Sequence, residues 1–185
     1  MTVMIGRIFG LLGVYARGTR GAAAAEFALV LTLLSIPVLN VVDLGMYAYQ
    51  RMELQNGAQM GAQAAIAMAP NCTLPLTTGS CSGSYASTIA AAAHSTSLGT
   101  QVTVTSTTEE YWCVNPSTNQ LQQVGTAASP PSPFNCTAAG NTTDPTPGDY
   151  IRVTASYSYA PVFTGVSVAS LLTTPITDTV WMRLQ

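Results

Sequence analysis

The 185-residue sequence contains no lysine, and charged side chains of both signs make up only 8% of it. An ordinary soluble domain carries about 25% charged residues. Half of the six arginines lie in the first twenty positions, so no later segment offers the clustered basic face that nucleic-acid binding requires. Disorder is excluded too, because 48% of the residues are apolar. The composition instead favours one apolar segment and one modest folded domain.

Residues that carry chemistry are equally scarce. The one histidine, His94, follows an alanine run and is expected to be structural. No serine lies in a Gly-x-Ser-x-Gly elbow, and the chain has no glycine-rich phosphate loop. Glu109, Glu110 and Asp149 could offer oxygen ligands to calcium, but the Asp-x-Asp-x-Asp spacing of such sites is missing. We therefore predict no metal site and no cofactor, and the lack of a base–nucleophile pair argues against an anchored enzyme.

Cysteine is absent from the first 71 residues, and the four cysteines are Cys72, Cys81, Cys113 and Cys136. An even number on one side of an apolar segment indicates disulfides in an oxidising compartment. Zinc sites need closer ligand pairs than these, which leaves free buried thiols as the other interpretation. Pairing of sequence neighbours, Cys72 with Cys81 and Cys113 with Cys136, is the simplest of the three possible connectivities.

Residues 22–42 are the one stretch long enough to cross a membrane, and Glu26 is its sole ionisable residue. Arg17 and Arg20 precede this stretch and Asp43 follows it, so the positive-inside rule places the N-terminus in the cytoplasm. A buried core helix is the alternative interpretation. Residues 1–21 are predicted to be a leader, because their apolar run is too short to span and no small-residue cleavage site follows it.

The remaining sequence predicts an α+β fold: a long N-terminal transmembrane helix, then a small antiparallel-sheet domain with a second helix. The first helix should continue through residues 43–69 and stop at Pro70. Its glycines at 45, 57 and 61 indicate either close helix approach or mild flexibility. The predicted later elements are a helix over 85–98 and strands over 101–108, 111–114, 150–159 and 177–184, with an irregular excursion over 115–148. The predicted domains are 1–21, 22–69 and 70–185.

Glu26 needs an explanation, because an ionised carboxylate within an apolar span costs on the order of 3 kcal/mol. It is either hydrated near the headgroups or paired with a cation once the chain leaves the lipid. Gly21, four alanines, Glu26 and Phe27 resemble the prepilin processing site of the tight-adherence (Tad/Flp) pilus system. The likeness continues through Asp43-Leu44-Gly45 and Leu54-Gln55-Asn56 to Gly61-Ala62. Over residues 20–65 the sequence resembles the TadE-like pseudopilins.

The resemblance implies a non-catalytic pseudopilin or minor pilin that takes part in the assembly or tip of a Tad-type adhesive pilus. A prepilin peptidase would cut between Gly21 and Ala22, and Glu26 with Phe27 would act in assembly. Other implied partners are pilin and pseudopilin subunits, the assembly platform in the inner membrane, and lipid; nucleic acid is not among them. The C-terminal domain would be periplasmic, or extracellular in the pilus. The alternative is a membrane-anchored periplasmic binding or adhesin module that never enters a filament.

Overall fold

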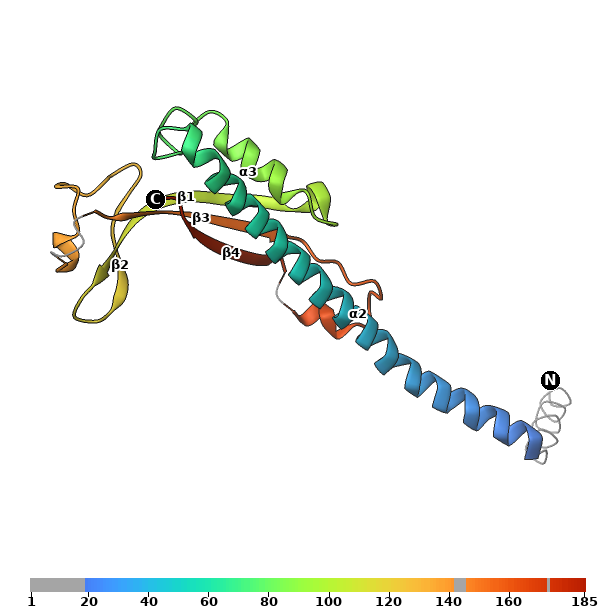
Figure 1. Cartoon of the computed structure of the whole chain (residues 1–185). Coiled ribbons are helices and arrows are strands. Elements are labelled where there is room, and N and C mark those ends of the chain that lie inside the picture. Colours follow the sequence, from blue (N-terminus) through green and yellow to red (C-terminus); the bar gives the residue numbers. More distant parts are fainter. Residues whose placement is uncertain (1–18, 142–145, 173) are drawn as a thin grey trace, which may run out of the picture. The chain divides into compact units, whose positions relative to one another are not determined.

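A computed structural model of the chain describes residues 19–141, 146–172 and 174–185, with side chains from Gly21 onward (Figure 1). Residues 1–18 of the predicted leader lie outside the described residues. The chain divides into two compact units. One combines the first helix up to Met46 with Pro161–Leu171, and the other combines Tyr47–Ala160 with Leu172–Gln185.

The first helix, α2, runs from Thr19 to Met68 and contributes to both units. Alanine, leucine and methionine supply strong helix formers along its length. Polar side chains within the apolar run bond back to the helix itself: the Thr32 hydroxyl donates to Ala28 O at 2.8 Å, and the Ser35 hydroxyl donates to Thr32 O at 2.8 Å. These bonds satisfy the hydroxyl groups without water, as a membrane-spanning helix requires.

The second unit contains a four-stranded antiparallel sheet in the order β2-β1-β3-β4. The strands are β1 (Thr103–Asn115), β2 (Gln120–Thr126), β3 (Gly148–Tyr157) and β4 (Ile176–Arg183), and the second helix is α3 (Tyr85–Ala93). Short 3-10 turns are η1 (Ala69–Asn71), η2 (Gly99–Gln101), η3 (Thr137–Ala139) and η4 (Val168–Leu171). The predicted α+β class, with a long first helix and a second helix beside the sheet, is confirmed.

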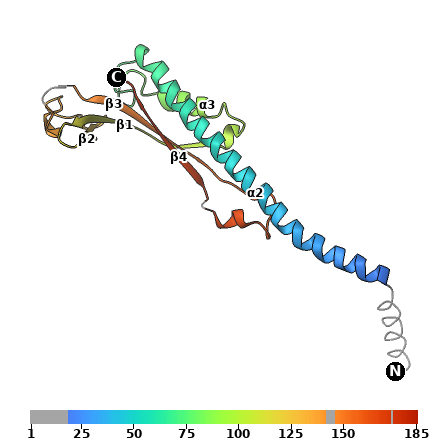
Figure 2. The ribbon, with the colours of Figure 1, turned by 60° about the horizontal axis from the view of Figure 1, so that its bottom comes forward.

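One face of the sheet is covered by α3 and by the C-terminal part of α2, which lie side by side (Figure 1, Figure 2). Their shared core is a cluster of fully buried side chains: Ala62, Ala65, Leu76, Ile89, Ile151 and Val153. Small residues let the two helices approach. A Cβ on Gly57 would lie 3.0 Å from Ala93 O, and a Cβ on Gly61 would lie 3.1 Å from the Ile89 side chain. Close approach is therefore the explanation for two of the three glycines.

Three expected element bounds were wrong. The helix predicted to reach Leu98 ends at Ala93, because the Ser-Thr-Ser run that follows offers side chains that compete for backbone bonds. The two strands predicted at 101–108 and 111–114 form one strand, β1, whose register shifts at bulges. Within the expected irregular excursion, β2 pairs with β1.

The missed strand follows a four-residue hairpin loop between Asn115 and Gln120. In this loop the Asn119 amide donates to Asn115 O at 2.8 Å, and Asn119 adopts a positive φ of 52°. Asparagine tolerates that conformation better than most residues. The glutamine-rich strand that follows is mostly exposed, so it shows no alternation of apolar and polar residues from which to predict it.

Candidate functional site

The predicted processing and assembly residues lie on the first turns of the described part of α2. Gly21, Ala22, Glu26 and Phe27 are all exposed, and Phe27 retains 67% of its surface. Among the residues that the structure describes, none forms a hydrogen bond or ion pair with the Glu26 carboxylate. Within this single chain, the carboxylate and the aromatic ring are therefore available for contact with another molecule.

The apolar side chains that follow Glu26 form a continuous exposed surface. Ten large ones are exposed by 46% or more: Phe27, Leu29, Val30, Leu31, Leu33, Leu34, Ile36, Val38, Val41 and Val42. Among the described residues, α2 is the helix long and apolar enough to cross a membrane, and it fits a single-pass anchor. The core-helix alternative predicted burial of this stretch, whereas the stretch is exposed in the chain by itself.

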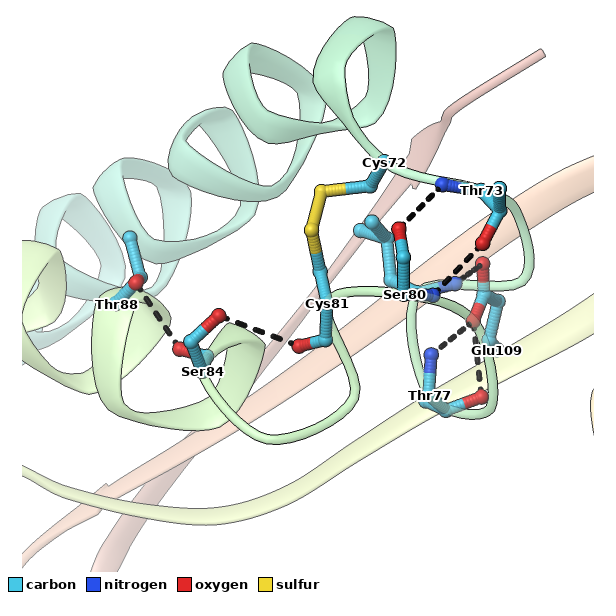
Figure 3. Close-up of a disulfide and its surroundings, with 9 residues drawn as sticks. Cys72, Thr73, Thr77, Ser80, Cys81, Ser84, Thr88 and Glu109 are labelled. Carbon is cyan, nitrogen blue, oxygen red and sulfur yellow. Dashed lines mark hydrogen bonds between the residues drawn. A yellow bond between two sulfur atoms is a disulfide. The ribbon is translucent and has the colours of Figure 1, made fainter.

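The structure joins Cys72 to Cys81, the pairing of sequence neighbours. This disulfide closes the loop after α2, and two reciprocal bonds support it: Thr73 N donates to Ser80 Oγ at 2.9 Å, and Ser80 N donates to Thr73 Oγ1 at 2.7 Å (Figure 3). The loop is therefore held covalently and through backbone–side chain bonds.

Glu109 on β1 anchors the same loop to the sheet. Its carboxylate accepts bonds from Leu76 N at 2.9 Å, from Thr77 N at 3.0 Å and from Thr77 Oγ1 at 2.9 Å. The Glu109 side chain is 3% exposed, and these three donors replace the water that its charge has lost.

The second disulfide joins Cys113 on β1 to Cys136. Both cysteines are buried with Ala139 in a small separate cluster, and Val124 of β2 packs against it. This bridge attaches the proline-rich segment to the sheet, where little other apolar material is available.

The three acidic residues considered for calcium divide between the two faces of the sheet. Glu110 pairs with Arg152 at 3.7 Å on the face of the sheet away from the helices, whereas Glu109 and Asp149 lie toward the helix side. Burial, followed by the charge of Glu109 and a hydrogen bond with it, raises the pKa of Asp149 to about 7. Burial and the same two carboxylates raise the pKa of Tyr111 to about 12. Within the described ranges no three potential ligands gather as a metal site would require.

An aromatic group on the open face of the sheet was missed by the sequence prediction. Trp112, Leu121, Tyr150 and Trp181 line a shallow pocket of about 210 Å³. The two indole rings meet edge to face with their centres 5.5 Å apart, within the range of about 4.5–7 Å for favourable aromatic pairs. The Arg152 guanidinium lies 5.2 Å from the Trp181 ring centre. The alternation within β1, β3 and β4 could have placed Trp112, Tyr150 and Trp181 on one face, had the strand register been known.

The geometry thus gives an exposed glycine, acid and aromatic residue at the head of an exposed apolar helix, followed by a buried face of small residues. Residues 21–63 match the family model described as TadE-like protein. The TadE-like segment lies entirely on α2, and the match confirms the resemblance and indicates a pilin-like protein associated with the Tad pilus. Searches among curated proteins and among solved structures found no match.

Proposed function

We propose that the chain is a non-catalytic pseudopilin or minor pilin, processed between Gly21 and Ala22, that takes part in the assembly or tip of a Tad-type pilus. The observation that carries the proposal is the TadE-like segment on a helix whose apolar side chains are exposed from Phe27 to Val42. Such a surface is stable in lipid or in a bundle of similar helices, and not in water. The helix would move from the first environment to the second when the subunit assembles.

Cleavage would be performed by a prepilin peptidase at the cytoplasmic face of the inner membrane. Glycine at position 21 fits a narrow peptidase subsite and weakens the helix locally by about 1 kcal/mol relative to alanine. Gly21→Leu should therefore leave an uncut precursor, whereas Gly45→Leu, the same change later in α2, should be cut normally. Mass spectrometry of the N-terminus in pilus-producing cells tests this step, and an intact leader in wild-type cells would refute it.

Glu26 would pair with the new α-amine of Ala22 in a neighbouring subunit. Neither charge is stable alone in an apolar bundle, and a subunit docked one turn away would leave both unpaired. The pair therefore sets the register of assembly more than it adds affinity. The chain has no lysine, so the α-amine is the sole amine of the processed subunit.

This absence makes a direct test possible. A carbodiimide joins contacting amines and carboxylates without a spacer, so every amide link made by the amine of the processed chain begins at Ala22. Assembled wild-type material should give a link from Ala22 of one copy to Glu26 of another. Glu26→Gln and Glu26→Ala should lose the link and reduce incorporation, while Asp178→Asn, which removes a carboxylate from β4, should keep both. Processing must be measured in the same cells. A Glu26→Gln subunit that is cut and incorporated at the wild-type level would refute the pairing.

The alternative function is an anchored periplasmic binding or adhesin module. The aromatic pocket of Trp112, Leu121, Tyr150 and Trp181 is the feature that favours it, although its volume of about 210 Å³ is below that of ordinary small-molecule sites. An uncut leader together with a stable membrane monomer would support this alternative over the pilin.

A further inference from the structure

The segment Pro161–Leu171, called here the return loop, is held against α2 by two polar side chains in the unit that they share. The Asn40 side chain donates to Val166 O at 3.1 Å and accepts from Val168 N at 2.6 Å. Asp43 accepts from Val162 N at 2.9 Å and from Phe163 N at 3.3 Å. Figure 1 shows the return loop, in orange, beside the middle of α2.

These bonds fix the depth of the return loop along the anchor. Residues 22–42 form 21 residues of helix, which at 1.5 Å per residue gives about 31 Å. The hydrocarbon core of a bilayer is about 30 Å thick. If residues 22–42 cross it, then Asn40 and Asp43 lie at its far boundary, and the return loop lies at the same level.

The return loop also has the surface that this boundary requires. It contains no charged residue. Its exposed apolar side chains are Val162 at 60%, Val166 at 48%, Val168 at 47% and Leu171 at 85% of their surface. Val38, Val41 and Val42 of α2, close in the chain to Asn40 and Asp43, are exposed as well.

Several backbone groups of the return loop have hydrogen-bond partners within the protein and so do not need water. A polar backbone group in lipid must find a partner within the protein. Asn40 and Asp43 supply partners for three amides and one carbonyl of the return loop, and the Asp43 side chain is itself fully buried. This role also explains why two polar residues end the apolar run of the anchor.

We infer that the return loop is a membrane-contacting segment, with its apolar side chains inserted at the interface of the leaflet that the C-terminal end of the anchor reaches. The inference rests on the proposed membrane anchor. The partner is the acyl–headgroup boundary of a lipid bilayer.

The test uses the full chain reconstituted at low density in phosphatidylcholine–phosphatidylglycerol vesicles, with phosphatidylcholine brominated high on its acyl chains as quencher. Tryptophan is introduced one site at a time as Leu171→Trp, as Leu31→Trp within the anchor, and as Leu121→Trp on β2. The wild-type chain supplies the background from its own two tryptophans. Leu171→Trp should lose roughly half of the added emission, as expected for a ring held about 5–10 Å into the interface, and Leu121→Trp should lose almost none.

The controls separate two kinds of failure. Quenching of Leu31→Trp without quenching of Leu171→Trp would overturn the inference and leave the anchor intact. No quenching of Leu31→Trp would overturn the anchor itself. If Leu171→Trp becomes shielded only when vesicles carry many copies, the return loop contacts protein and the inference is wrong. Leu171→Asp provides a second measurement. In vesicles, hydrogen exchange of the return-loop amides should rise in this variant, whereas exchange of the β3 amides should stay unchanged.

Discussion

Replacing Asp149 with asparagine should stabilise the protein at pH 8, and this gain should nearly vanish at pH 4. Asp149 lies at the start of β3, opposite Tyr111, and its side chain is 4% exposed. Its Oδ1 atom has no hydrogen-bond partner among the described residues. The neighbouring Glu109 carboxylate accepts from Leu76 N and Thr77 N, and burial together with the charge of Glu109 raises the pKa of Asp149, so Asp149 takes up a proton.

The sign follows from proton linkage. Burial and the Glu109 charge raise the pKa of Asp149 from 3.8 to about 7, so between these values the folded state binds more protons than the unfolded state. Stability therefore falls as pH rises from about 4 to 7 and levels off above 7. The full shift corresponds to roughly 4 kcal/mol at 1.36 kcal/mol per pH unit. Asp149 lines a surface pocket with Tyr111 and Phe134, so solvent screening should reduce the effect to about 2 kcal/mol.

Asparagine carries no charge and can donate to Glu109 as protonated aspartate does, so Asp149→Asn mimics the low-pH form. Thermal unfolding of the full chain in detergent, followed by near-UV circular dichroism under non-reducing conditions, should show Asp149→Asn melting about 6 °C above wild type at pH 8. At pH 5 the difference should shrink to about 40% of its value at pH 8, and at pH 4 it should nearly vanish. Asp178→Asn, on the neighbouring strand β4, should show no such pH-dependent difference. An Asp149→Asn variant less stable than wild type at both pH values would refute the assignment of the proton.

Four further outcomes follow from packing and covalent structure. Non-reducing peptide mapping should recover both neighbour-paired disulfides and no crossed pair, and the double change Cys113→Ser with Cys136→Ser should lower stability by about 3 kcal/mol in a denaturant titration. Gly61→Leu should destabilise by about 1–3 kcal/mol, because its Cβ would already lie 3.1 Å from Ile89. Gly45→Leu should be tolerated in the monomer, because no atom lies within 4 Å of that Cβ; equal losses for both glycines would contradict this account of the helix contact.

The sequence was informative where the physical signal is local. The apolar run of 22–42 and the helix stop near Pro70 follow from composition and from proline, and α2 ends at Met68. The strands of residues 150–157 and 177–183 alternate in burial because one face lies against the helices, and the same alternation is visible in the letters.

The sequence was uninformative where the cause is tertiary. β2 forms because β1 offers it an edge and because the Cys113–Cys136 bridge holds the following segment nearby. The carboxylates of Glu109 and Asp149 meet only through the register of β1 with β3. Forty residues separate them in the chain, and no local pattern encodes their contact.

The contacts between the return loop and α2 could not be predicted from the sequence for the same reason. Asn40 and Asp43 lie about 120 residues before the amides that they bind, and their sequence pattern indicates only the end of an apolar run. Their importance is testable by removing the acceptors without changing side-chain shape much. Asp43→Leu and Asn40→Leu both keep the size of the side chain and remove its hydrogen-bonding atoms.

If these two side chains hold the return loop, each change should act on its own amides. In full-length protein, Asp43→Leu should speed hydrogen exchange at Val162 and Phe163 by roughly tenfold or more, because those amides lose their acceptors. Asn40→Leu should do the same at Val168. Thr32→Val is the matched control, since the Thr32 hydroxyl bonds only within α2, at Ala28 O. Exchange that is equally fast in wild type, or unchanged in both variants, would show that other contacts hold the segment. A local rise at the paired amides, with the amides of β3 still protected, would show that the end of the anchor positions the return loop.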